Sequence, residues 1–163
     1  MKSNALLFLV VMLSFLPLLS CNKSPVKGCD STCEIHGTCD YATGKCDCNS
    51  GYEGTNCEIE TRARFVGNYA VKQDSSGTIK TYNCIISSGT GNPYSISIAA
   101  LNNASFQATV SAGNSITISD FNPEFIEIRG SGNLSGNVIS LNITFKPNFN
   151  PAYTLNFTLT KQQ

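Results

Sequence analysis

Six cysteines crowd into one short segment, and this constrains the chain more than any other feature. They stand at positions 29, 33, 39, 46, 48 and 57, so a stretch of 29 residues holds six of the eight cysteines. A segment below about 40 residues rarely buries enough apolar surface to fold without disulfides or a metal. Six cysteines allow 15 pairings, and excluding a strained bridge between Cys46 and Cys48 leaves most of these open.

The first twenty residues have the form of an export signal. Lys2 is followed by an apolar run from Ala5 to Leu19, which Pro17 interrupts. A transmembrane helix needs about 20 consecutive apolar residues, so this shorter run fits a cleaved signal better. We therefore expect residues 1–20 to be a signal peptide.

The end of this signal, Leu18-Leu19-Ser20-Cys21, resembles the lipobox of bacterial lipoproteins. The resemblance implies cleavage before Cys21 and acylation of that cysteine, with residues 21–28 as a lipidated tether. Each buried methylene contributes about 0.8 kcal/mol, so two or three acyl chains hold a small protein on a membrane. The alternative is an ordinary signal peptide in which the cysteine is a coincidence.

The residues after Cys21 bear on which membrane would hold the protein. Residue 22 is Asn rather than Asp, so nothing resembles the inner-membrane retention signal of some lipoproteins. The acidic cluster that many surface-displayed lipoproteins carry is also missing from this stretch. We expect a lipid anchor in the outer membrane and leave open whether the periplasmic or the cell-surface face carries the protein.

Export would place the cysteine-rich segment in an oxidising compartment, where disulfides form and persist. Residues 29–57 resemble an epidermal growth factor (EGF)-like module with the short, tenascin-type spacing. The resemblance rests on His36-Gly37-Thr38-Cys39 followed by Cys46-x-Cys48-x-x-Gly51-Tyr52-x-Gly54-x-x-Cys57. It implies the disulfides Cys29–Cys39, Cys33–Cys46 and Cys48–Cys57.

The sequence points away from a metal or another cofactor. Calcium-binding EGF modules carry acidic or amide residues just before the first cysteine, because Ca²⁺ takes oxygen ligands. Here residues 24–28 read Ser-Pro-Val-Lys-Gly, without a carboxylate. Zinc sites use Cys-x-x-Cys pairs of reduced cysteines, and this segment has neither feature. His36, the one histidine, is expected to be a solvated loop residue.

The distribution of charge divides the chain. Eleven basic and eleven acidic side chains balance, which excludes a basic nucleic-acid-binding protein. Residues 22–61 hold three basic and seven acidic side chains, whereas residues 62–163 hold seven basic and four acidic ones. We take residues 58–64 as a linker and residues 65–163 as a second domain.

Apolar residues alternate with polar ones through nearly all of this second domain, which is typical of half-buried strands. Turn residues separate eight runs and predict an eight-stranded antiparallel barrel, because closure removes exposed sheet edges. A two-sheet sandwich is the alternative. The opening Phe65-x-Gly67-x-Tyr69 resembles lipocalin-like barrels in its general pattern, and Gly130 and Gly132 suggest a bend or bulge. The runs cover residues 65–71, 82–86, 94–98, 106–110, 116–118, 126–134, 139–145 and 153–159.

The second domain offers few combinations of residues that could form a catalytic site. Cys84 shares its face with apolar neighbours, so we expect a buried thiol rather than a nucleophile. Asp120 and Glu124 form the closest carboxylate pair, but they flank a turn in which solvated acids are common. A serine or cysteine nucleophile would also lack a histidine within the domain. We expect a protein that is not an enzyme.

The function that fits these features is that of a membrane-anchored module that binds or adheres to an unknown protein or glycan. EGF-like modules serve mostly as rigid spacers and protein contacts, and an eight-stranded barrel is only just wide enough to be filled by its own side chains. Exposed turns would then form the contacts, with Tyr52, Phe121 and Phe149 as aromatic anchors. The alternative is a lipocalin-like carrier that holds a small apolar ligand inside the barrel.

Overall fold

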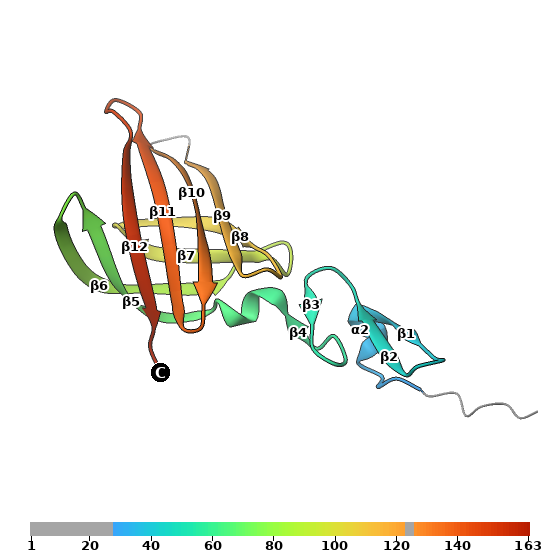
Figure 1. Cartoon of the computed structure of the whole chain (residues 1–163). Helices are drawn as coiled ribbons and strands as arrows, with labels where there is room; N and C mark the ends of the chain where they lie inside the picture. The colour runs from blue at the N-terminus through green and yellow to red at the C-terminus, as the bar shows by residue number, and fades with distance from the viewer. Residues whose placement is uncertain (1–27, 123–125) are drawn as a thin grey trace, which may run out of the picture.

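The computed structural model describes residues 28–122 and 126–163; the predicted signal peptide, Cys21 and the predicted tether before residue 28 lie outside these ranges. The chain is mainly β and has two parts, a cysteine-rich segment of short elements and a closed barrel of long strands (Figure 1). Within the described ranges, no helix combines the length and the apolar character that crossing a bilayer requires.

The cysteine-rich segment contains one helical turn and two small hairpins. The first hairpin is antiparallel and places Cys39 opposite Cys46, and the second pairs Tyr52 with Glu60. Very little of this segment is buried apart from its cysteines, of which Cys33 and Cys57 are fully covered. Its elements are α2 (Cys33–His36), β1 (Gly37–Asp40), β2 (Lys45–Cys48), β3 (Tyr52–Glu53) and β4 (Ile59–Glu60).

Three disulfides tie these short elements together. They join the same three pairs that the EGF resemblance implies, Cys29–Cys39, Cys33–Cys46 and Cys48–Cys57. Each bridge links positions 9 to 13 residues apart. The bridges therefore supply the cross-links that a segment with almost no apolar core needs.

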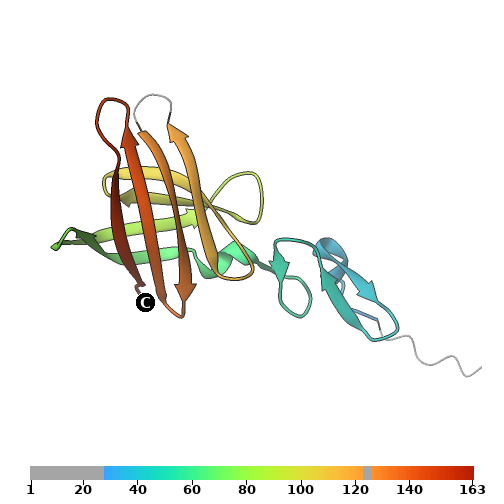
Figure 2. The ribbon, with the colours of Figure 1, turned by 45° about the horizontal axis from the view of Figure 1, so that its top comes forward.

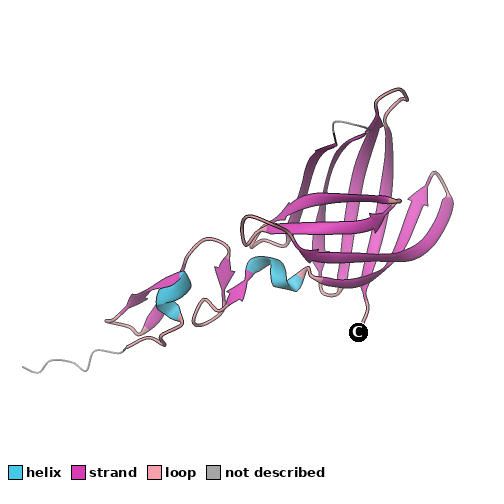
Figure 3. Cartoon of the chain, turned by 180° about the vertical axis from the view of Figure 1, so that it is seen from behind, coloured by secondary structure: helices cyan, strands magenta, loops and turns pink. Residues whose placement is uncertain are grey.

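The second part is a closed, eight-stranded antiparallel barrel, as the alternating pattern predicts (Figures 1 and 3). Each strand pairs with the next one along the chain, and β12 returns to pair with β5, for example at Leu159 and Val71. Closure excludes the two-sheet sandwich. The strands are β5 (Gly67–Ser75), β6 (Thr78–Ser88), β7 (Ser95–Leu101), β8 (Ala104–Val110), β9 (Ser115–Asn122), β10 (Ile126–Ser135), β11 (Val138–Pro147) and β12 (Tyr153–Lys161).

Alternate residues of these strands point inward and fill the barrel with one apolar core. Among the described residues, this core has 22 buried side chains, which include five aromatic rings. Tyr69, the largest, is fully buried, and its hydroxyl donates a hydrogen bond of 2.7 Å to the carbonyl oxygen of Phe65. Burial raises the pKa of Tyr69 to about 12, so the hydroxyl keeps its proton at neutral pH. The five rings are those of Phe65, Tyr69, Phe106, Phe145 and Phe157.

The two glycines of β10 do not form the bulge that the sequence analysis gave as one possibility. The register of β10 continues without a shift past Gly130 and Gly132 on both sides. A Cβ at Gly132 would lie 2.3 Å from the carbonyl oxygen of Ser140, so these positions are glycine because β11 approaches too closely for a side chain. The irregularity lies instead in β7, between Ile98 and Leu101.

Candidate functional site

The junction between the two parts is built from the segment that the sequence analysis takes as a linker. Residues 58–64 contain strand β4 and the 3-10 turn η1 (Thr61–Arg64), which leads directly into the barrel. Thr61 is buried, and its backbone N–H donates a hydrogen bond of 2.8 Å to the carbonyl oxygen of Gly51. The segment is therefore bonded to the EGF-like module rather than free of it.

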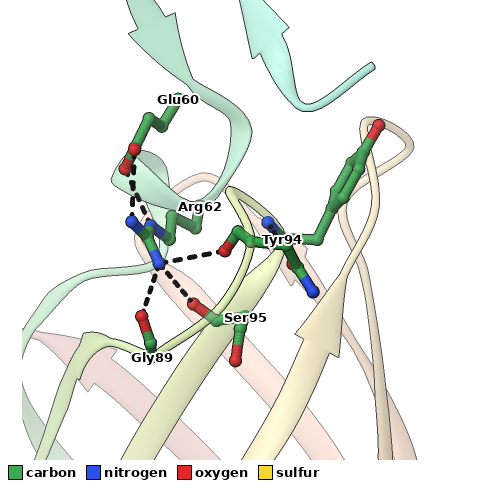
Figure 4. Close-up of polar contacts among 6 residues, drawn as sticks. Glu60, Arg62, Gly89, Tyr94 and Ser95 are labelled. Atoms are coloured by element: carbon green, nitrogen blue, oxygen red, sulfur yellow. Dashed lines mark hydrogen bonds and ion pairs between the residues drawn. The ribbon is translucent and has the colours of Figure 1, made fainter.

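Arg62 holds this segment against the loop between β6 and β7 (Figure 4). Its Nη1 donates to the carbonyl oxygens of Gly89, Asn92 and Ser95 at 2.7, 3.1 and 3.2 Å. Its Nε and Nη2 pair with both carboxylate oxygens of Glu60 at 2.7 and 3.1 Å. The planar guanidinium thus joins β4 to three backbone carbonyls of the barrel, a geometry that a lysine does not offer.

Arg64 makes a second bridge, on the other side of the same turn. Its guanidinium forms an ion pair with Glu53 of β3 and donates a hydrogen bond of 2.6 Å to Oδ1 of Asn114, in the β8–β9 turn. Lys161, near the end of β12, donates from Nζ to the carbonyl oxygen of Arg64 at 3.2 Å. Two arginines therefore connect β3 and β4 of the EGF-like module to two separate loops of the barrel.

Direct packing completes the junction at Gly51. This residue is buried and has φ +96°, a left-handed conformation that glycine adopts without strain. A Cβ at Gly51 would lie 2.3 Å from Cγ of Pro93 and 3.3 Å from the ring of Tyr94. The backbone of the module thus packs on the β6–β7 loop and covers part of it, so this loop is less accessible to an external partner than the fully exposed turns that the sequence analysis expects.

The predicted aromatic contacts do not form one site. Tyr52 is half-buried beside the junction and stacks on His36, with ring centroids 3.8 Å apart and planes 7° from parallel. His36, expected to be a solvated loop residue, is in fact half-buried at the end of α2 because of this stack. Phe149 lies in the β11–β12 loop and is 98% exposed. The backbone of Phe121 belongs to β9, but its side chain lies outside the described part.

The β11–β12 loop occupies the end of the barrel that faces away from the EGF-like module (Figure 2). Strand register brings the start of β10 to the same end, because Ile126 lies between Asn122 of β9 and Pro147 of β11. Tyr153 follows the loop and is 42% exposed. We call this end of β9 to β12, with its loop, the distal tip.

Charged side chains line the outer wall just below the distal tip. Glu127 pairs with Arg129 on the same strand and with Nζ of Lys146 at 3.7 Å on β11. Together with Thr144 and Ala152 these residues line a surface hollow of about 470 Å³. The sequence analysis missed this hollow, although the outward alternation of Glu127 and Arg129 was a signal for an exposed charged face.

The cysteines of the described residues supply no reactive thiol. The sulfur atoms of Cys46, Cys48 and Cys57 lie within 4.8 Å of one another, but each belongs to a disulfide and offers no thiolate to a metal. Cys84 is free and buried in the core, and burial raises the pKa of its thiol to about 11. Cys84 is therefore a protonated core residue at neutral pH, placed inward as its neighbours predict.

Comparison with known proteins bears on the cysteine-rich segment. Residues 29–60 match the family described as the Teneurin-like EGF domain. The match ends at the last residue of β4, so it includes the second hairpin as well as the six cysteines. No curated protein matches the chain.

Proposed function

We propose that the protein is a lipid-anchored, non-enzymatic interaction module of the bacterial outer membrane. The acyl chains on Cys21 hold it at the membrane, the EGF-like module is a rigid spacer, and the distal tip of the barrel binds a protein or glycan. The observation that carries this proposal is Phe149, an aromatic side chain that is 98% exposed in the β11–β12 loop of the distal tip.

Two features favour contact through the tip. An exposed aromatic ring costs solubility and is a frequent anchor of binding interfaces. Tyr153, 42% exposed, follows the same loop, and Glu127, Arg129 and Lys146 on the adjoining strands supply groups that form hydrogen bonds and ion pairs at an interface rim. The arginine-bridged junction supports the spacer role, because it joins the module to the β6–β7 and β8–β9 loops, at the end of the barrel opposite the tip (Figure 2).

The filled interior argues against the alternative, a carrier of apolar ligands. Five aromatic rings and 17 other apolar residues occupy the inside of the barrel, as the 22 members of the core show. A carrier needs an apolar cavity that encloses most of its ligand. An enclosed ligand would therefore have to displace packed core side chains.

The tip is tested by crosslinking in the native membrane. A photoreactive amino acid at position 149 should trap a discrete partner, and Phe149→Ser should abolish capture by the purified protein. Ile79, 54% exposed on the β5–β6 hairpin, gives the matched control, because Ile79→Ser removes an exposed apolar side chain elsewhere on the barrel. Equal losses for both variants, or no trapped partner, would contradict binding at the tip.

The carrier and the anchor have separate tests. Saturable one-to-one binding of a fluorescent fatty acid, lost when Phe157 or Leu141 is changed, would favour a transport function over the proposed interaction module.

The lipid anchor is tested at Cys21. Cys21→Ser should move the protein from the membrane to the soluble fraction, and mass spectrometry should detect acyl chains on Cys21. A Cys21→Ser variant that stays membrane-bound after a salt wash would contradict lipid anchoring but would not bear on binding at the tip.

A further inference from the structure

A second hollow lies where the β5–β6 hairpin reaches past its neighbour β7. Strand β6 pairs with β7 only from Ile85 to Ser88, so its first half has β5 alone as a partner. The turn between β7 and β8, at Asn102 and Asn103, closes the other side. The hollow has a volume of about 470 Å³ and is lined by Gln73, Lys80, Thr81, Tyr82, Asn102 and Asn103.

The Tyr82 hydroxyl sets the orientation of the Gln73 amide at the floor of this hollow. The backbone N–H of Asn102 donates to the Tyr82 hydroxyl oxygen at 2.9 Å. The hydroxyl proton is then directed to Oε1 of Gln73, 2.8 Å away. Because the amide oxygen faces Tyr82, the Nε2 group with its two N–H donors is turned away from the tyrosine.

Among the described residues, no acceptor pairs with these donors of Gln73. Across residues 28–122 and 126–163, the bond from Tyr82 is the one hydrogen bond of the Gln73 side chain. Gln73 is only 3% exposed and is one of two buried polar residues in the described chain. No buried side-chain nitrogen or oxygen of the described residues lacks a hydrogen-bond partner, so Nε2 is accessible from the hollow and is free to donate to a ligand there.

The charge of the hollow indicates what that acceptor is. Lys80 lies directly opposite Gln73 across the β5–β6 pair and is exposed. In the described part of the chain Lys80 forms no ion pair, and the lining contains no acidic side chain. An amide donor beside an ammonium group favours a carboxylate, which accepts charge-assisted hydrogen bonds at two oxygens.

We propose that this hollow binds a small polar carboxylate, with Gln73 Nε2 and Lys80 Nζ donating to its oxygens. The side chains of Asn102 and Asn103 provide further hydrogen-bonding groups for the polar remainder of the ligand. The packed core beneath Gln73 leaves no room for an apolar tail, because Phe157 of β12 lies opposite it on the other side of β5. This site is separate from the distal tip and its partner.

The proposal is tested by nuclear magnetic resonance of the purified, disulfide-bonded chain labelled with nitrogen-15. Glucuronate, citrate and N-acetylalanine are the carboxylate probes, and glucose and N-acetylalaninamide are neutral controls. At least one acid should shift the side-chain amide signals of Gln73 and Asn102 saturably, while the neutral compounds leave them unchanged.

Two lysine variants show whether the hollow is responsible. Lys80→Ala should weaken the acid's affinity about tenfold, the usual effect of losing one charge-assisted hydrogen bond. Lys72→Ala removes the same charge from an exposed position on the same hairpin, outside the hollow, and should leave the affinity unchanged. Gln73→Leu should abolish the shift of the Asn102 side-chain amide signal. If that core variant fails to fold, the variant of the exposed Lys80 still tests the proposal.

Three outcomes would overturn the proposal. The first is that none of the three acids gives a saturable shift. The second is that glucose or N-acetylalaninamide shifts the signals as strongly as the acids. The third is that Lys72→Ala weakens binding as much as Lys80→Ala.

Discussion

The EGF-like module and the barrel are stabilised by different means. In the module, three disulfides within 29 residues take the place of a core, and the buried apolar residues there are cysteines. In the barrel, 22 buried apolar side chains form one core, and its one cysteine is a free, buried thiol. The comparison shows one chain using covalent and hydrophobic stabilisation side by side.

The junction is stabilised neither by disulfides nor by an apolar core. It consists of two arginines, the carboxylates of Glu53 and Glu60 and backbone carbonyl oxygens, together with a glycine packed on a proline. Partly exposed polar contacts of this kind contribute less than a core or a disulfide. Their effect is to fix how the two parts are oriented.

Reduction of the disulfides should have the most different effects on the two parts. Each disulfide stabilises by about 2–4 kcal/mol, more than a small module without a core can lose. We expect dithiothreitol to unfold residues 29–57 while the barrel keeps its far-ultraviolet circular dichroism. Loss of both signals together would show that the junction makes one cooperative unit of the molecule.

Truncation of one aromatic ring in the core should destabilise the barrel and leave the module folded. Phe157 is 2% exposed and packs edge-on to Phe145, with ring centroids 6.4 Å apart. Phe157→Ala should lower the free energy of unfolding of the barrel by about 3–5 kcal/mol and leave the disulfide-bonded module folded. Phe149→Ala, the same change at a fully exposed ring, should alter it by less than about 0.5 kcal/mol. Similar losses in denaturant unfolding would contradict the assignment of inside and outside.

Alkaline pH should act on the barrel through its buried thiol. Burial raises the pKa of Cys84 from 9.0 to about 11, so the folded state keeps a proton that the unfolded state loses. The free energy of unfolding should therefore fall between about pH 9 and pH 11, by roughly 2–3 kcal/mol from this group. Cys84→Ala should remove that part of the decline. Below pH 9 the folded protein should also resist alkylation, and rapid labelling would count against an inward thiol.

Arg62→Ala should have a modest effect on stability and the clearest effect on the orientation of the two parts. The change removes the ion pair with Glu60 and hydrogen bonds to three carbonyl oxygens. We expect a loss of about 1–3 kcal/mol at the junction and independent tumbling of the two parts in relaxation measurements. Arg129, 75% exposed and paired with Glu127, is the control, and Arg129→Ala should leave tumbling unchanged. Unchanged tumbling of the Arg62 variant would show that packing at Gly51 suffices.

Both parts of the fold were predictable because local regularities encode them. Alternation from Tyr69 through Leu159 places one side chain in two on the inside, and an eight-stranded barrel buries such a pattern without leaving edges. The spacing of the cysteines allowed many pairings by itself, and the EGF resemblance selected the three that the structure has. The exposure of Phe149 follows from its place between two prolines in a turn.

The junction and both hollows depended on contacts between residues far apart in the sequence. Arg62 in the predicted linker gives no sign that it binds carbonyl oxygens 27 to 33 residues away. Tyr52 looked like an exposed anchor until the structure placed it against His36. The orientation of the Gln73 amide depends on Tyr82, which the backbone N–H of Asn102 orients in turn. Local sequence therefore determined which residues lie inside and outside, and tertiary structure decided which polar groups meet, because hydrogen bonding depends on position in space.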